Sequence, residues 1–184
     1  MATAAQSSGK KSAKSKSAGA KKSAAPRKAP QKDAIQLLKA DHREVEGWFS
    51  QFEKATNDGK KAELVQKILL ALKVHTQIEE ELVYPPSREV VKDDELVDEA
   101  IVEHDAAKKL MAEIESMQPS DEMYDAKVKV LSEQIEHHVE EEEKEYFPQL
   151  QKSELDLKAI GEQMEARKQE LMGQLAPAQP TTMQ

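Results

Sequence analysis

The sequence predicts an all-α protein, and three observations support this prediction. Apolar residues recur at helical spacing from Asp33 to about Gly173, whereas the alternation typical of a strand is missing. Turn-forming residues interrupt the pattern at 56–59, 84–87 and 118–120. The pattern also repeats after 62 or 63 residues. We therefore expect an antiparallel up-down four-helix bundle built from two helical-hairpin repeats, followed by a C-terminal fifth helix.

The helices follow one another between these turns. The first should begin at Asp33, a favourable N-cap residue, and the fourth at Ser120, which is another. The second should end at YPPS, residues 84–87, because prolines interrupt helices. A fifth helix, capped by Ser153, should run to about Gly173 and pack along the bundle. The apolar stripes contain Ile35, Leu38, Val45, Phe49, Phe52, Val65, Ile68, Leu72, Val97, Ile101, Ala107, Met111, Ile114, Val128, Leu131, Ile135, Leu157, Ile160, Met164 and Leu171.

The two ends of the chain lie outside the helical pattern. Residues 1–32 contain nine of the 27 Lys and Arg residues and none of the 35 acidic ones, among Ala, Ser, Gly and Pro. Such a segment buries too little apolar surface to offset its ordering entropy, so residues 1–32 and 176–184 are predicted to be disordered and 33–175 to form one domain. Lysines without aromatic neighbours favour weak, non-specific binding to nucleic acid, and the alternative is an inert, solubilising extension.

Composition excludes several classes of protein. The chain has no cysteine, which rules out disulfides, thiolate metal sites and cysteine nucleophiles. No apolar run approaches the roughly 18 residues of a membrane span. The N-terminus lacks the apolar region of a secretory signal. We expect a soluble, cytoplasmic protein without membrane contact, and we find no nucleotide-binding loop or hydrolase triad.

Histidine carries the functional signal. Four of the five histidines lie on the apolar stripes of four different helices, namely His42, His75, His104 and His138. In the second and fourth helices, His75 and His138 are each followed four residues later by a glutamate, Glu79 or Glu142, so both side chains of each pair project from the same helix face. A single histidine on an apolar face is usually a hydrogen-bonded core residue. Four that are placed by an internal repeat are better explained by a shared function.

A divalent metal ion explains the pattern physically. Two buried carboxylates would repel each other and lose their solvation unless a cation lay between them. Imidazole together with carboxylate suits iron, manganese or zinc. Glutamate and histidine on facing helices are also the ligands of dimetal carboxylate bundles. The sequence therefore predicts a metal centre formed by His42, His75, Glu79, His104, His138 and Glu142.

Neighbouring polar and aromatic residues are assigned to other roles. Only one of His137 and His138 can face the site, because adjacent helical residues point about 100° apart, and the repeat selects His138. His137 is expected at the surface, with contact to a metal ligand as the alternative. Glu46, one turn after His42, is within reach of the metal, but a position at the surface or against a metal ligand is favoured. The glutamates around Glu142 are expected to be solvated or interfacial. The aromatic residues Tyr84, Tyr146, Trp48 and Phe49 are expected in the core.

Four segments together are similar to a known family. DHREVEGWF, HTQIEEELVYP, EHDAAKKLM and HHVEEEEKEYFP resemble the ligand helices of the hemerythrin-like, or HHE cation-binding, family over residues 33 to about 172. The resemblance implies a non-haem di-iron centre with an oxo or hydroxo bridge, and manganese or zinc is the less favoured alternative. By this resemblance His42 and His75 bind one iron, His104 and His138 bind the other, and Glu79 and Glu142 bridge them.

One position departs from the family's oxygen carriers. Those proteins have a further histidine one turn after the lone histidine of the third helix, where this chain has Lys108. A protonated ammonium is not a metal ligand. The resemblance then implies open metal positions and favours binding or reaction of oxygen, peroxide or nitric oxide over reversible oxygen carriage. Enzymatic removal of peroxide or nitric oxide stays open, as does a non-catalytic iron-binding or storage module tethered to DNA by its basic tail.

Overall fold

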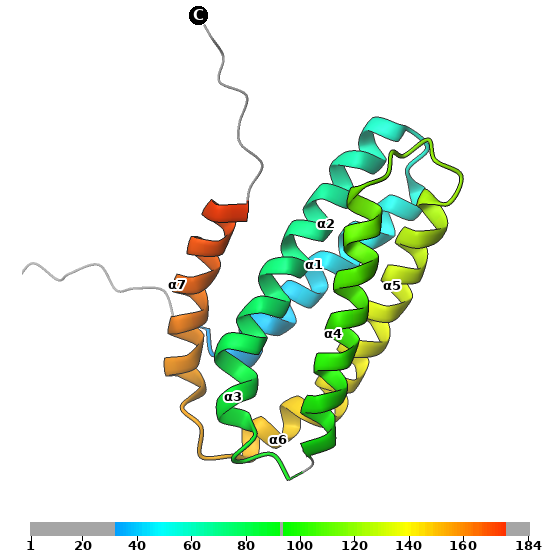
Figure 1. Cartoon of the computed structure of the whole chain (residues 1–184). Coiled ribbons are helices and arrows are strands. Elements are labelled where there is room, and N and C mark those ends of the chain that lie inside the picture. Colours follow the sequence, from blue (N-terminus) through cyan, green and yellow to red (C-terminus); the bar gives the residue numbers. More distant parts are fainter. Residues whose placement is uncertain (1–31, 93, 176–184) are drawn as a thin grey trace, which may run out of the picture.

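Four long helices run side by side in alternating directions and a fifth lies against one side of them (Figure 1). This computed structural model describes residues 32–92 and 94–175, within which every regular element is helical. The long helices are α1 (Ala34–Lys54), α2 (Asp58–Ile78), α4 (Asp94–Glu115) and α5 (Tyr124–Glu141), and the fifth is α7 (Leu157–Leu175). The predicted all-α bundle with a C-terminal helix is confirmed. The predicted disordered ends, apart from Lys32, lie outside the described residues.

The first two helices begin where their capping residues predict. Asp33 Oδ1 accepts a hydrogen bond from the Gln36 N–H at 2.8 Å, and Gln36 Oε1 accepts one from the Asp33 N–H at 3.2 Å. This reciprocal pair is a capping box. At the start of α2, Asn57 Oδ1 accepts the Lys60 N–H at 3.0 Å. Each cap satisfies backbone donors that the first turn of a helix leaves free.

Two other predicted caps are wrong. Helix α5 starts at Tyr124, because the chain first makes a turn in which Asp121 Oδ2 accepts the Gln118 N–H, so Ser120 caps nothing. Helix α7 starts at Leu157, where Asp156 Oδ1 accepts the Ala159 N–H at 3.0 Å. The Ser153 hydroxyl instead donates to the Leu150 carbonyl at the end of the preceding helix. At α7 the capping bond expected from serine is made by Asp156, and at α5 no side chain caps the helix.

The prediction that YPPS ends the second helix is also wrong. Helix α2 continues through a π-helical turn, η1 (Glu79–Val83), into the short helix α3 (Tyr84–Ser87), and the chain leaves the helix only afterwards. The π-helical turn is closed by a bond from the Tyr84 N–H to the Glu79 carbonyl. Both prolines then lie in the first turn of α3, where no backbone donor is needed. The second hairpin repeats this arrangement in η2 (Glu142–Tyr146) and α6 (Phe147–Lys152).

The buried polar residues divide the core into two apolar clusters. One cluster contains Phe49, Phe52 and Met111, and the other contains Ile35, Leu38 and Phe147. Along α1, His42 falls between the two clusters, and the other predicted ligands occupy the same level of the bundle. The metal site is therefore enclosed by apolar side chains at both ends.

Helix α7 covers the first hairpin, on the side away from α4 and α5 (Figure 1). Gly161 allows a close approach, since a Cβ atom there would lie 2.9 Å from the Ala34 nitrogen and from the Lys32 carbonyl oxygen. Met164 and Leu171 then pack into the same apolar cluster as Val74 and Ile78 of α2. Among the described residues, no helix is both long enough and apolar enough to cross a bilayer.

Candidate metal centre

The six predicted ligands lie together in the middle of the bundle, and every one is buried. Helices α1, α2, α4 and α5 contribute one histidine each, and each glutamate is the first residue of a π-helical turn. Two groups of these side chains have ligand atoms within 4.8 Å of one another, close enough to share a cation. The first group is His42, His75, Glu79 and Glu142, and the second is Glu79, His104 and His138.

The histidines form two pairs whose Nε2 atoms point at each other. The Nε2 atoms of His42 and His75 are 3.3 Å apart, and those of His104 and His138 are 3.1 Å apart. These are the pairs that the resemblance assigned to two separate metal ions. Two unprotonated Nε2 lone pairs at such distances repel, so the arrangement favours a cation that both nitrogens can bind.

The two glutamates connect the histidine pairs. Glu79 Oε2 lies 3.2 Å from His75 Nε2 and 3.4 Å from His104 Nε2, one histidine of each pair. Glu142 Oε2 lies 3.4 and 3.7 Å from Nε2 of the remaining two. Each carboxylate therefore occupies the position that a bridging ligand would need. Both oxygens of Glu79 and Oε2 of Glu142 are buried and lack hydrogen-bond partners, an arrangement that costs free energy unless a cation is bound.

Acidic side chains lie behind the histidines, on their Nδ1 sides. Nδ1 is 3.0 Å from Glu143 in His42, 2.8 Å from Glu80 in His104, and 2.8 Å from Glu103 in His138. Asp41 is farther from His75 Nδ1, at 3.8 Å. A proton on Nδ1, donated to such a carboxylate, leaves the Nε2 lone pair directed at the centre and fixes the orientation of the ring.

Sequence reasoning missed these outer carboxylates. Glu143 was expected to be solvated or interfacial, whereas its side chain is 18 % exposed and contacts His42. The signal was present in the repeat. An acidic residue precedes each lone histidine (Asp41, Glu103) and another follows each bridging glutamate (Glu80, Glu143), with the same offsets of 62 and 63. Interpreting the glutamate run as a solvated face concealed this regularity.

Cations complete the outer layer. The Lys108 ammonium donates to both oxygens of Glu80, at 2.5 and 2.7 Å, so it acts on His104 only through that carboxylate. Arg43 has the corresponding place in the first hairpin, where it donates to Glu143. Glu46 pairs with Arg43 and lies outside both groups of candidate ligands. Lys108 is thus tied to an outer carboxylate at the position where oxygen carriers have a further histidine.

Among the tyrosines and the tryptophan that the structure describes, Tyr84 alone reaches the predicted ligands with a polar atom. It is buried, as expected for a core residue, but its hydroxyl lies 3.2 Å from Glu142 Oε1 and 3.4 Å from His104 Nε2. Burial, together with the charges of Glu79 and Glu142, raises the pKa of Tyr84 well above its usual value. The hydroxyl therefore stays protonated and donates to Glu142. The equivalent residue of the other hairpin, Phe147, has no hydroxyl and stacks on His42 instead.

In the metal-free protein, protons compensate the buried carboxylates. Burial alone would lower the pKa of His75, but Glu79, Asp41 and Glu142 outweigh this effect and raise it to about 10. The pKa of His138 is likewise raised to about 9 by nearby carboxylates despite burial. A metal ion would replace these protons, because only neutral imidazole binds metal.

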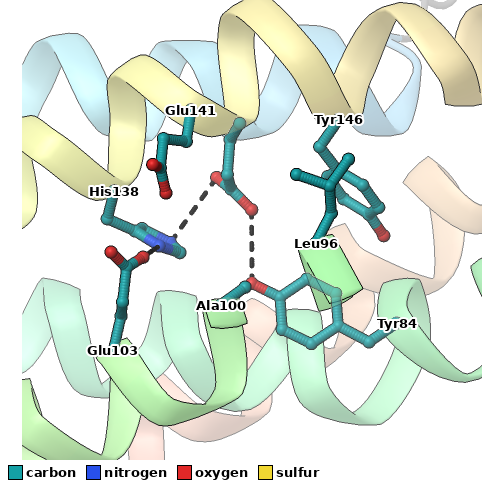
Figure 2. A pocket seen from close by; sticks show the side chains of 8 residues that line it. Tyr84, Leu96, Ala100, Glu103, His138, Glu141 and Tyr146 are labelled. Atoms are coloured by element: carbon teal, nitrogen blue, oxygen red, sulfur yellow. Dashed lines mark hydrogen bonds and ion pairs between the residues drawn. The ribbon is translucent and has the colours of Figure 1, made fainter. Parts of the chain in front are cut away.

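A small cavity adjoins the second histidine pair. It has a volume of about 10 Å³, which is close to the space that one water molecule needs. Figure 2 shows Glu103 of α4 and Glu141 of α5 converging beside His138 on one side of this cavity, with Tyr84 on the other. His137 lies at the surface, as expected, with 62 % of its side chain exposed. The lining residues are Tyr84, Leu96, Ala100, Glu103, His138, Glu141, Glu142 and Tyr146.

Comparisons with known proteins agree with this geometry. The model of the hemerythrin HHE cation binding domain family matches residues 33–150, which include all six predicted ligands. A crystal structure of a hemerythrin HHE cation binding domain-containing protein from Mycobacterium kansasii superposes with a TM-score of 0.66 at 25 % identity, covering 77 % of this chain and 88 % of the other. Comparison with the curated proteins finds no match. The family match spans most of the chain, and the chain belongs to the hemerythrin HHE cation-binding domain family.

Proposed function

We propose that this protein binds two iron ions at the six predicted ligands and that the centre reacts with oxygen, peroxide or nitric oxide. The observation that carries the proposal is the convergence of four Nε2 atoms and two buried carboxylates that lack hydrogen-bond partners for three of their oxygens. Such a group is costly to bury alone and is stabilised by cations. The donor set, imidazole with carboxylate, fits iron.

The arrangement of the residues assigns a role to each side chain. His42 and His75 would hold one ion and His104 and His138 the other, with Glu79 and Glu142 shared between them. The outer carboxylates orient the histidine rings through Nδ1, and Tyr84 orients Glu142. Iron, when bound, would supply a change of oxidation state and coordination positions for a small ligand.

The size of the cavity supports a small ligand. A space of about 10 Å³ beside His138 and Tyr84 admits a diatomic molecule or peroxide far more readily than an organic substrate. Lys108 supports reaction over reversible carriage, because it is bound to Glu80 and adds no third imidazole to the second pair. The Tyr84 hydroxyl lies at the edge of the same cavity, where its proton is donated to Glu142 and its oxygen is free to accept a hydrogen bond from a protonated ligand.

Metal content after anaerobic loading with iron(II) tests the proposal. We expect about two tightly bound iron ions per chain, as in other dimetal carboxylate bundles. Absorbance after mixing the reduced protein with oxygen, hydrogen peroxide or nitric oxide then identifies the ligand. Less than one tightly bound ion per chain would contradict the metal proposal. Full loading without reaction toward any of the three ligands would leave a non-catalytic iron-binding module.

A further inference from the structure

The two hairpins have predicted ligands of the same types at corresponding positions, but their outer faces differ. Three positions just outside the ligands correspond through the internal repeat. In the first hairpin they are occupied by an acid and two apolar residues, and in the second by acids and a histidine. The corresponding pairs are Asp41 and Glu103, Val74 and His137, and Ile78 and Glu141.

The first hairpin is closed at these positions. Val74 and Ile78 are buried in the apolar cluster that includes Met164 of α7. The third position, Asp41, is neutralised by Lys168 of α7, which donates to its carboxylate. Helix α7 therefore supplies an apolar side chain and a cation at the positions that correspond to the acids and the histidine of the second hairpin.

The second hairpin is open at the same positions and offers metal ligands there. His137 Nε2 lies 3.3 Å from Glu141 Oε1 and 3.7 Å from Glu103 Oε1. One ligand atom from each of the three residues lies within 4.8 Å of the others. We call these three residues the outer cluster. Two carboxylates and one imidazole on adjacent helices are suited to a divalent transition-metal ion.

A physical connection joins the outer cluster to the buried centre. The other carboxylate oxygen of Glu103, Oε2, lies 2.8 Å from Nδ1 of His138, so Glu103 belongs to both groups. Glu103 and Glu141 line the small cavity whose inner wall includes His138 and Glu142 (Figure 2). Glu142 is 2 % exposed, and its Oε2 lacks a hydrogen-bond partner. A metal ion held at the outer cluster therefore lies across the small cavity from Glu142, a carboxylate with an oxygen that lacks a hydrogen-bond partner.

The charge around the outer cluster also favours cations. Within residues 32–92 and 94–175, no lysine or arginine forms an ion pair with Glu103 or Glu141. Glu141 is instead close enough to Glu99 and Glu145 to feel their negative charges. Clustered carboxylates of this kind raise the local concentration of cations at the surface.

We propose that Glu103, His137 and Glu141 form an outer site for a divalent transition-metal ion, from which the ion passes into the buried centre. The inference rests on the proposed metal centre and adds to it the route by which that centre is filled. Binding at the outer site is weaker than in the centre, because the cluster has three ligands and is partly exposed. Among the described residues the first hairpin has no equivalent cluster, because Val74 and Ile78 stand in place of His137 and Glu141.

Cobalt(II) uptake by the metal-free, full-length protein tests the route, with ligand-field absorbance followed in a stopped-flow instrument. His137→Ala and Glu141→Gln should slow uptake about tenfold at limiting metal, the lower end of the effect expected from cation accumulation. The final amount of cobalt and its final spectrum should stay unchanged, because neither residue belongs to the six predicted ligands. Glu140→Gln is the matched control, since it removes one charge next to the cluster from an exposed residue paired with Lys144.

A second measurement examines the outer site itself. After the centre has been filled, manganese(II) titration followed by electron paramagnetic resonance should detect one additional, weaker site in the parent protein and none in His137→Ala. Wild-type uptake rates in both outer-cluster variants would overturn the route, and so would an equal slowing by Glu140→Gln or a lower final cobalt content. If the parent protein takes up no metal, the metal centre itself is disproved, which is a different result.

Discussion

The α1–α2 hairpin and the α4–α5 hairpin contain the same predicted ligand pattern but have different surroundings. In the first, α7 provides Lys168 to Asp41 and Arg167 to Glu81, and apolar residues seal the face. In the second, the equivalent face is exposed and the outer cluster occupies it. The internal repeat thus accounts for the candidate ligands, whereas the fifth helix distinguishes the face of the first hairpin from the face that carries the proposed outer site.

A second difference lies inside the bundle. Tyr84 follows the first π-helical turn and Phe147 follows the second, at equivalent positions of the repeat. The Tyr84 hydroxyl crosses to the other hairpin and lies near His104 and Glu142, whereas Phe147 only stacks on His42. The two halves of a nearly symmetric site therefore differ chemically, and the half with a hydroxyl is the half beside the cavity.

The largest effect is expected from the shared carboxylates, because each contacts histidines of both pairs. Glu79→Ala and Glu142→Ala should both reduce tightly bound iron from about two ions per chain to less than one. Elemental analysis after anaerobic loading measures this. Glu140→Ala, two positions before Glu142 at an exposed residue that pairs with Lys144, is the control and should retain full occupancy. Equal losses in all three variants would mean that the assignment of ligands along the helix is wrong.

The outer carboxylates are expected to support metal binding more strongly in the second hairpin than in the first. Glu103→Gln removes the negative charge of an acceptor 2.8 Å from His138 Nδ1, whereas Asp41→Asn removes that of a carboxylate 3.8 Å from His75 Nδ1. Loss of such a partner weakens metal binding roughly 10- to 100-fold, and we expect the glutamine variant near the upper end and the asparagine variant near the lower end. Competition with a chelator of known affinity measures both. The reverse order would show that distance to Nδ1 does not govern this support.

The fit of the covering helix can be tested at one glycine. A Cβ at Gly161 would meet backbone atoms of α1 at 2.9 Å, and backbone cannot move as a flexible side chain can. Gly161→Ala should therefore lower the free energy of unfolding by about 1–3 kcal/mol. Gly47→Ala, also inside a helix but with open space around it, should raise it by up to about 1 kcal/mol. Urea unfolding of the metal-free proteins measures both changes in the free energy of unfolding. A change of the same sign in both variants would contradict the close approach at Gly161.

The smallest effect is expected from the exposed ion pair between α7 and the first hairpin. Hydrogen bonds from Arg167 lower the pKa of Glu81 to about 2. Because the folded pKa lies below the usual value, the pair stabilises the fold above pH 4.5 and loses this contribution as the pH falls toward 2. Arg167→Met should slightly lower stability at pH 7 and remove that part of the acid sensitivity. Thermal unfolding at several pH values measures the difference in stability between the variant and the parent protein. A decrease of the same size at every pH would count against this role of the ion pair.

Much of the centre could be predicted because its information is local and repeated. Helical spacing places His75 and Glu79 on one face, and the recurrence of the pair as His138 and Glu142 marks them as functional. The preference of aspartate for N-cap positions likewise located the start of the first helix at Asp33. Such local reasoning has limits. It failed at YPPS, because a change from i→i−4 to i→i−5 hydrogen bonding leaves no signature in hydrophobic periodicity. It also failed at Glu143, whose partner His42 is 101 residues away.

By itself, the sequence determined the helices, their order and the six candidate ligands, because period and repeat specify which side chains share a helix face. Only the tertiary structure decided which face the fifth helix covers. The apolar stripe of α7 indicates that it packs, but it does not select between two similar hairpins. That choice depends on contacts such as Lys168 with Asp41, 127 residues apart, and on the backbone approach at Gly161. Partners this distant are selected by the fit of the whole bundle, which no local pattern contains.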